Sequence, residues 1–349
     1  MEKEFDFTPT EDQFGVFWKY LMQPEVTGVN YSNGMLWITD LSRGRYPVQD
    51  VVTDKFLTQF ANTIANSANK HFSSADPVLE ADTRDLRISI LHPSIARTGM
   101  AISLRKSPPV LRHTEESLIA SGFCSREVLN LLINCVKAKL VIVFGGEPEA
   151  GKTELAKFMM QYIDPADRVI TIEDSLELHY GEINPGHDCL ELQIRDGFDY
   201  KTAIKTSLRQ DPRWLMLSEA RSSEVVSLLE SWSTGIAGFT TIHLDDVRKL
   251  PDRVQNMMED KKDVERLENR IYSDVNVGVL IRMRTEADGS IRRYLDQLCF
   301  YTRENGENHM NQVVEDGRMA DGSKEFPADI MKRMREAGII DPYRCTKGI

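Results

Sequence analysis

Residues 146–153 read GEPEAGKT and match G-x-x-x-x-G-K-[ST], the pattern of a phosphate-binding loop. Glycines let backbone N–H groups approach a polyphosphate, and the start of the next helix adds unpaired N–H groups and a partial positive charge. We expect Lys152 to reach the β- and γ-phosphates and the Thr153 hydroxyl to coordinate Mg²⁺. The pattern therefore predicts a nucleotide site that contains Gly146, Ala150, Gly151, Lys152, Thr153 and Glu154.

The flanking sequence has the form that this loop requires. Residues 140–144 (LVIVF) are apolar and rich in β-branched side chains, as in a buried strand. Residues 154–160 (ELAKFMM) are good helix formers with apolar side chains at helical spacing. A glycine-rich turn before an ordinary helix is the alternative interpretation. Glu147 and Glu149 would repel phosphate, so we expect both to point outward.

Two acids follow a later apolar strand. Residues 169–172 predict a strand, which leads into Glu173 and, shortly after, Glu177. Open α/β sheets bind their ligands at the carboxyl ends of strands, so both glutamates are candidates for the site. For the two adjacent acids after the strand, Glu173 and Asp174, a helix-capping pair is an equally good interpretation when they are taken alone.

Two further strand ends carry candidate side chains. Residues 214–217 predict a strand that ends near Glu219, where an acid holds Mg²⁺ or orients the attacking water. Residues 239–242 predict a strand that ends in His243. A lone histidine is more often structural, but at this place it would sense the γ-phosphate. A solvated helix start is the alternative for Glu219.

Short strands and helices alternate from residue 139 onward. This alternation predicts a parallel sheet with helices on both faces, hence an α/β domain over residues 139–349. Residues 275–283 and 291–301 predict a later antiparallel pair, and residues 327–338 a helix. We expect residues 113–138 to form a linker and connecting helices, with an N-cap at Thr114.

Residues 1–112 are predicted to form a separate α+β domain. The dipeptide Asn33-Gly34 lies between two apolar runs and predicts a β-hairpin over residues 26–38, because both residues tolerate positive φ. The other predicted elements are helices over 10–22 and 51–72 and strands over 78–81, 86–91 and 100–104.

Composition excludes several classes of protein. A net charge of −11 argues against general nucleic-acid binding, and we expect no direct sequence-specific contact with nucleic acid. The apolar runs are too short to span a bilayer, and the acidic residues 1–6 are not typical of a signal peptide. The five cysteines are scattered and never form C-x-x-C, which predicts a reducing cytoplasm and no zinc knuckle.

Four segments in fixed order resemble the secretion ATPases of type IV secretion, type II secretion and type IV pilus systems. They are the phosphate loop, an acidic box at 172–177 (IEDSLE), residues 208–221 (LRQDPRWLMLSEAR) and a histidine box at 234–243. Residues 87–90 (RISI) and 101–106 (AISLRK) are similar to the N-terminal domain of the subgroup that serves conjugation and type IV secretion.

The resemblance implies a RecA-like ATPase domain, a ring of six subunits and ATP with Mg²⁺ bound between two domains. It implies that Lys152 and Thr153 hold phosphate and metal, that Glu219 is the Walker-B-type acid and metal ligand, and that Arg209 belongs to the site. Glu173 and Glu177 would position water or metal, and His243 would contact phosphate. Arg105 would supply positive charge to the γ-phosphate.

The implied activity is ATP hydrolysis that powers a conjugative or type IV secretion machine. The implied location is cytoplasmic, at the inner face of the membrane, beside membrane-bound components of the machine. The family usually has glycine at Ser218, histidine at Ile236 and small neutral residues at Glu147 and Glu149. These departures favour an alternative, a nucleotide-binding assembly or regulatory subunit with little hydrolysis. A motor for pilus extension or retraction is the third possibility.

Overall fold

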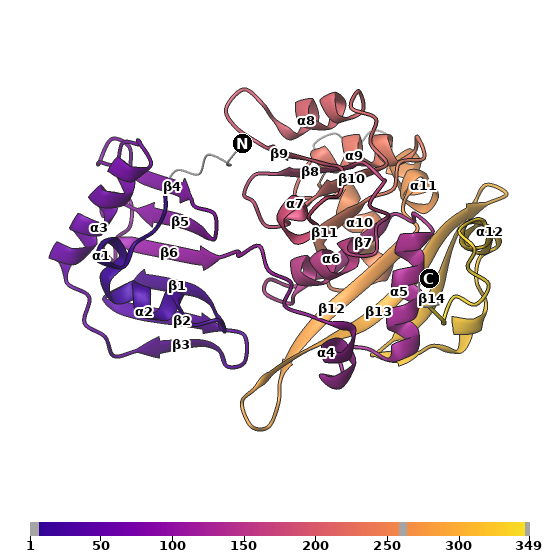
Figure 1. Cartoon of the computed structure of the whole chain (residues 1–349), viewed down its shortest axis with the longest axis horizontal. Helices are drawn as coiled ribbons and strands as arrows, with labels where there is room; N and C mark the ends of the chain where they lie inside the picture. The colour runs from indigo at the N-terminus through magenta and orange to yellow at the C-terminus, as the bar shows by residue number, and fades with distance from the viewer. Residues whose placement is uncertain (1–6, 258–263, 346–349) are drawn as a thin grey trace. The chain divides into compact units, whose positions relative to one another are not determined.

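The computed structural model describes residues 7–257 and 264–345, so the acidic stretch 1–6 lies outside the described residues. The chain divides into two compact units. The first comprises Met1–Pro109 and Thr285–Arg292, and the second comprises Val110–Arg284 and Arg293–Ile349. Each unit is described by itself (Figure 1).

The first unit is built on a six-stranded antiparallel sheet with helices on one face. Its strand order is β3-β2-β1-β6-β5-β4. The predicted hairpin is confirmed, because Asn33 and Gly34 have φ values of 51° and 74° between the first two strands. The strands are β1 Val26–Ser32, β2 Met35–Asp40, β3 Gly44–Val48, β4 Val78–Asp82, β5 Leu86–Leu91 and β6 Ala101–Lys106.

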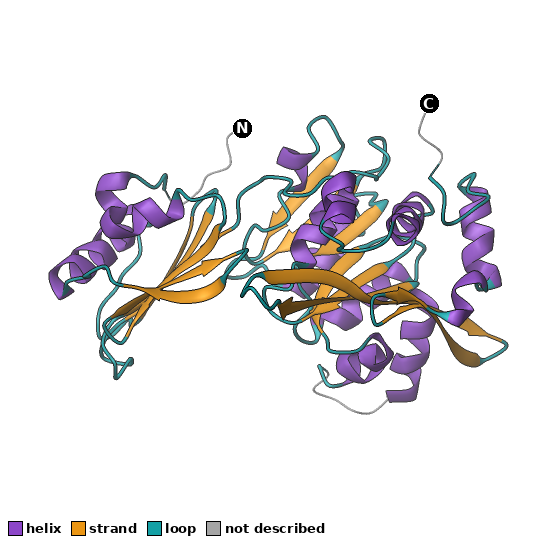
Figure 2. Cartoon of the chain, turned by 90° about the horizontal axis from the view of Figure 1, so that it is seen from below, coloured by secondary structure: helices purple, strands orange, loops and turns teal. Residues whose placement is uncertain are grey.

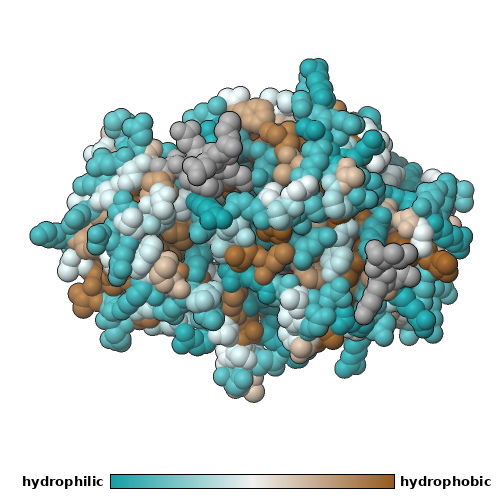
Figure 3. All heavy atoms as spheres, viewed as in Figure 1, coloured by the Kyte–Doolittle hydropathy of each residue, from teal (hydrophilic) through white to brown (hydrophobic). Residues whose placement is uncertain are grey.

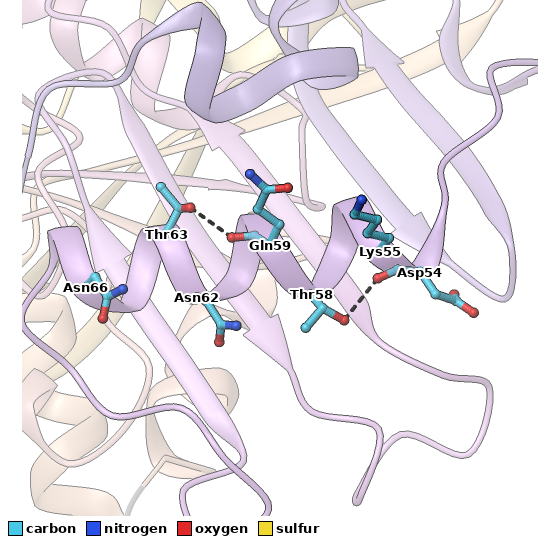
Figure 4. A pocket seen from close by; sticks show the side chains of 7 residues that line it. All are labelled: Asp54, Lys55, Thr58, Gln59, Asn62, Thr63 and Asn66. Carbon is cyan, nitrogen blue, oxygen red and sulfur yellow. Dashed lines mark hydrogen bonds between the residues drawn. The ribbon is translucent and has the colours of Figure 1, made fainter.

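Helix α3 (Asp54–Ser67) packs against the sheet of the first unit. The short helices α1 (Glu11–Phe14) and α2 (Trp18–Leu21) precede it in the chain. Helix α3 is shorter than predicted at both ends: Thr53 caps its start, accepting the Phe56 N–H at 3.2 Å, and the chain leaves the helix at Asn69, which has φ 52°. One face of α3 is buried in the core, while the opposite face is polar and holds a shallow surface pocket (Figure 4). That face carries Asp54, Lys55, Thr58, Gln59, Asn62, Thr63 and Asn66.

The second unit contains a nine-stranded mixed sheet. Its strand order is β15-β14-β13-β12-β7-β11-β10-β8-β9, and the pairings from β12 to β9 are parallel. The predicted parallel sheet is therefore confirmed. The strands are β7 Ile142–Gly146, β8 Val169–Glu173, β9 Cys189–Gln193, β10 Trp214–Leu217, β11 Phe239–His243, β12 Val277–Thr285, β13 Ile291–Glu304, β14 Glu307–Glu315 and β15 Arg318–Met319.

Helices cover both faces of this sheet (Figure 2). Along β7, Ile142 and Phe144 join one hydrophobic core, while Val143 and the preceding Val141 join the other. Strands buried on both faces read as continuous apolar runs, which is why these were visible in the sequence. The helices are α4 Glu115–Ala120, α5 Arg126–Lys137, α6 Lys152–Met160, α7 Tyr180–Ile183, α8 Tyr200–Ser207, α9 Glu224–Trp232, α10 Leu250–Gln255, α11 Val264–Asp274 and α12 Ala328–Glu336, with short 3₁₀ turns η2 Val247–Lys249 and η3 Asp321–Lys324.

The parallel order brings the carboxyl ends of β7, β8, β10 and β11 to one edge of the sheet. In open α/β sheets, this edge is where ligands bind.

Within the described residues, no helix combines the length and apolar character needed to cross a membrane. The visible face of the molecule is mainly hydrophilic, with hydrophobic residues scattered among the polar ones (Figure 3).

Candidate nucleotide-binding site

The phosphate loop connects the end of β7 to the start of α6. Gly146 has φ +151°, and a Cβ there would lie 2.5 Å from the Ile281 carbonyl oxygen. Gly151 has φ +99°, a value that side chains disfavour. Glu147 and Glu149 are exposed, which agrees with the expectation that their carboxylates point outward. The loop thus combines the two glycines that its path requires with acids at its surface.

Lys152 is buried at the start of α6, with only 8% of its surface exposed. Its Nζ donates to the carbonyl oxygens of Gly146 at 3.1 Å and Glu147 at 2.8 Å, and it lies 3.4 Å from Nδ1 of His243. An ammonium group can only donate, so this contact makes Nδ1 the acceptor and places the imidazole proton on Nε2. This contact is therefore compatible with the tautomer of His243 that carries its proton on Nε2.

His243 links the lysine to the acid at the end of β10. Its Nε2 lies 2.8 Å from Oε1 of Glu219, and the Glu219 side chain is 19% exposed. The other oxygen of Glu219, Oε2, accepts two hydrogen bonds from Arg221, whose Nη1 in turn donates to Asp174. We call Lys152, His243, Glu219, Arg221 and Asp174 the outer network.

The structure brings the predicted residues Lys152, His243 and Glu219 together from three strand ends. Arg221 and Asp174 were not among the predicted site residues. The signal for both was present in the sequence, because Asp174 directly follows the apolar strand that ends at Glu173, and Arg221 lies two residues after the candidate acid Glu219.

Thr153 and Glu177 form a second contact beside the loop. The Thr153 hydroxyl donates to Oε2 of Glu177 at 3.3 Å. Carboxylate and hydroxyl oxygens are the ligands that Mg²⁺ prefers. The part of the chain that the structure describes holds no cluster of three or more metal-binding side chains. A site of this kind binds Mg²⁺ through one or two carboxylates and the substrate phosphates, so the oxygens of Thr153 and Glu177 fit that ion.

Glu173 is fully buried, unlike its neighbour Asp174. Its Oε1 accepts the backbone N–H groups of Glu177 at 3.0 Å and Leu178 at 2.9 Å. Its Oε2 is buried and has no hydrogen-bond partner among the described residues. Burial raises the pKa of Glu173 to about 8, although the two N–H bonds oppose this shift. Glu173 thus holds the backbone of Glu177 and does not itself face solvent.

Two more charged side chains of α6 lie beside Glu173. Lys157 is 2% exposed, and its Nζ lies 3.8 Å from Oε1 of Glu154. Burial lowers the pKa of Lys157, while the charges of Glu154, Glu177 and Glu173 act in the opposite direction. Glu154 also forms an ion pair with Arg112 at 3.7 Å. We call Glu173, Lys157 and Glu154 the inner group.

Two predicted site residues lie outside these contacts. Arg209 follows α8 and is exposed, and its backbone N–H donates to the Thr206 carbonyl at 3.1 Å. Arg105 lies in β6 of the first unit, opposite Gly28 and Arg87, with an exposed side chain. The nucleotide contacts expected of Arg209 and Arg105 stay predictions.

Comparison with known proteins identifies the type of chain that carries this site. Residues 74–321 match the family model described as type II/IV secretion system protein. A putative conjugal transfer protein of Mycobacterium tuberculosis is 25% identical over 236 residues, which cover 63% of this chain and 65% of that protein. The chain thus spans slightly less than two thirds of that relative. The type IV secretion system protein VirB11 of Brucella suis is 26% identical over 253 residues, or 64% of this chain and 70% of that protein.

Solved structures share the fold. The ATPase DotB of Yersinia pseudotuberculosis aligns with a TM-score of 0.62 at 14% identity and covers 96% of this chain and 87% of its own. The pilus retraction motor PilT with bound ADP aligns with a TM-score of 0.56 at 13% identity and covers 94% of this chain and 87% of its own. Identities this low support the fold alone.

Proposed function

Because the chain belongs to the type II/IV secretion system protein family, a family of P-loop secretion ATPases, we propose that it hydrolyses ATP to power a conjugative or type IV secretion machine. The observation that carries this proposal is the outer network, in which a phosphate-loop lysine, a histidine and a carboxylate meet at one edge of the sheet. Relatives named as conjugal transfer and VirB11 proteins favour this branch over pilus motors.

Each side chain has a role that its position supports. Lys152 would donate to the β- and γ-phosphates in place of the Gly146 and Glu147 carbonyls that it now contacts. Glu219 would orient the attacking water through Oε1, beside His243. Mg²⁺ held by Thr153, with Glu177 and Glu219 beside it, would supply positive charge to the phosphates. Arg105 and Arg209 would add charge from their own segments.

We further propose a homo-hexamer at the inner face of the cytoplasmic membrane, beside membrane-bound components of the machine. Six-membered rings are typical of this family. The second candidate is an assembly or regulatory subunit with little turnover, which Ser218, Ile236, Glu147 and Glu149 favour.

ATP hydrolysis by the purified full chain separates the two candidates. We expect Mg²⁺-dependent phosphate release that Lys152→Ala lowers to background, because the loop would lose the group that holds the β- and γ-phosphates. Oligomeric state is measured in the same samples by light scattering, with and without nucleotide. If the wild-type oligomer turns over no faster than Lys152→Ala, the low-turnover subunit is the better assignment.

A further inference from the structure

Two nitrogens of Arg221 donate hydrogen bonds to the same oxygen of Glu219, an arrangement that we call the fork. Nε and Nη2 of Arg221 donate to Oε2 at 2.9 and 2.8 Å. Two donors use both lone pairs of that oxygen, so Oε2 has no capacity left for a water molecule. Oε1 holds one contact, at 2.8 Å from Nε2 of His243, and keeps one lone pair. The fork therefore leaves Oε1 as the oxygen of Glu219 that can accept a further hydrogen bond.

The guanidinium group is itself anchored from a neighbouring strand. Nη1 of Arg221 donates to Oδ2 of Asp174 at 2.8 Å, and Asp174 follows β8, which pairs with β10. Glu224 fixes the backbone beneath, because its Oε1 accepts the N–H groups of Arg221 at 2.7 Å and Ser222 at 2.9 Å. Contacts to three separate acids hold one arginine in one place, which favours a precise orientation of Glu219.

A similar fork occurs elsewhere in the second unit. Arg248 follows Asp246 by two residues; its Nε donates to both oxygens of Asp246 and its Nη2 to Oδ2, at 2.7–3.0 Å. Its Nη1 donates to Glu315 at 3.2 Å, as Nη1 of Arg221 donates to Asp174. The side chains of Arg221 and Arg248 are 46% and 51% exposed. Arg248 is therefore a matched control with the same chemistry and a different acid.

We propose that Arg221 is a positioning residue for ATP hydrolysis, which occupies Oε2 of Glu219, is anchored by Asp174, and so directs Oε1 toward the attacking water. This inference rests on the proposed ATPase function. Loss of the fork lets the Glu219 carboxylate rotate, which lowers kcat. KM for ATP stays near the wild-type value, because Lys152 and the loop amides bind the phosphates.

Steady-state hydrolysis by the full chain tests this role. We expect Arg221→Ala to lower kcat by roughly 10- to 100-fold with KM changed less than about twofold, as misplaced catalytic groups do. Arg221→Lys keeps the charge but not the fork, so we expect it to recover little activity. Asp174→Asn, which loosens the anchor, should lower kcat less than Arg221→Ala. Arg248→Ala should stay within about twofold of wild type.

Chemical rescue separates positioning from damage to the fold. Millimolar guanidinium should restore part of kcat to Arg221→Ala, while sodium chloride of equal ionic strength should not, because only the planar cation can reoccupy the fork. An unfolded variant would not be rescued, and Arg221→Lys then provides the kinetic test. Wild-type kcat in Arg221→Ala or Arg221→Lys, a loss expressed mainly in KM, or an equal loss in Arg248→Ala would overturn the inference. Absence of wild-type turnover above Lys152→Ala would instead overturn the proposed function.

Discussion

The outer network and the inner group draw on the same strand ends and the same helix, yet their polar atoms are satisfied in different ways. In the outer network, both oxygens of Glu219 are bonded at 2.8–2.9 Å, and the side chains of His243 and Arg221 are more than 40% exposed. In the inner group, Lys157 is 2% exposed, and buried oxygens of Glu154 and Glu173 have no hydrogen-bond partner among the described residues.

Solvent access explains why this difference matters. An exposed polar group can exchange one partner for another at small cost, because water satisfies it in between. A buried group that loses its partner keeps the full cost of desolvation. We infer that the exposed side chains of Arg221 and His243 can release their contacts to Glu219 when phosphate binds, whereas the buried charges of the inner group have no such exchange with water.

The largest expected effect is that of Glu219→Gln on turnover. We expect kcat to fall about a thousandfold, which corresponds to about 4 kcal/mol, because the amide cannot accept a proton from water. Stability should change little, since the side chain is only partly buried. The measurements are phosphate release, binding of a fluorescent ATP analogue, and urea unfolding.

Asp246→Asn is the matched control for Glu219→Gln, because it alters the acid of the other arginine fork. We expect Asp246→Asn to keep kcat within about twofold of wild type. A loss of stability in Glu219→Gln as large as its loss of activity would show that the outer network is structural, and the distinction between the two groups would then be wrong.

The next largest effect is expected for Lys157→Met. The substitution keeps the length of the side chain but removes the buried cation beside Glu154, so we expect the free energy of unfolding to fall by about 3 kcal/mol. Lys249→Met is the control, because Lys249 pairs with Asp245 at 2.9 Å on the surface and should cost less than about 1 kcal/mol. Equal urea midpoints for Lys157→Met and wild type would contradict a structural role for the inner group.

The strands that position the site could be predicted because both faces of their sheet are buried. Strand β10 was predicted at its observed bounds, residues 214–217, and β8 to within one residue. Strands β3, β9 and β14 were missed. They lie near sheet edges and carry partly exposed polar side chains, so they lack the apolar run. The predicted helix over 51–72 was too long, because Thr53 caps it at the start and Asn69, at φ 52°, ends it.

The phosphate loop and its partners could be predicted from residue type and spacing, whereas the orientation of neighbouring acids could not. Glu173 and Asp174 are adjacent, but Glu173 is the last residue of β8 and Asp174 is the first residue after it, where the regular alternation of strand side chains ends. The sequence alone does not show which of the two is turned into the core. The structure buries Glu173 and leaves Asp174 to bind Arg221.

The smallest expected effect, taken over a single pH unit, concerns pH and tests that same pair of acids. The pKa of Glu173 is raised from 4.5 to about 8 in the fold, so between these values the folded chain keeps a proton that the unfolded chain releases. The free energy of unfolding should therefore contain a contribution that falls by about 1.4 kcal/mol per pH unit as pH rises through this window. Glu173→Gln keeps an oxygen for the two N–H groups but cannot titrate, so this slope should disappear.

Urea unfolding at several pH values between about 5.5 and 7.5 would measure this slope. The wild type should lose stability relative to Glu173→Gln as pH rises, while Asp174→Asn should keep the wild-type slope, because it leaves the Glu173 carboxyl in place. Parallel curves for wild type and Glu173→Gln would mean that Glu173 is ionised in the fold. The inner group would then hold a buried negative charge balanced by Lys157. In that case Lys157→Met should lower the free energy of unfolding by more than the about 3 kcal/mol expected above.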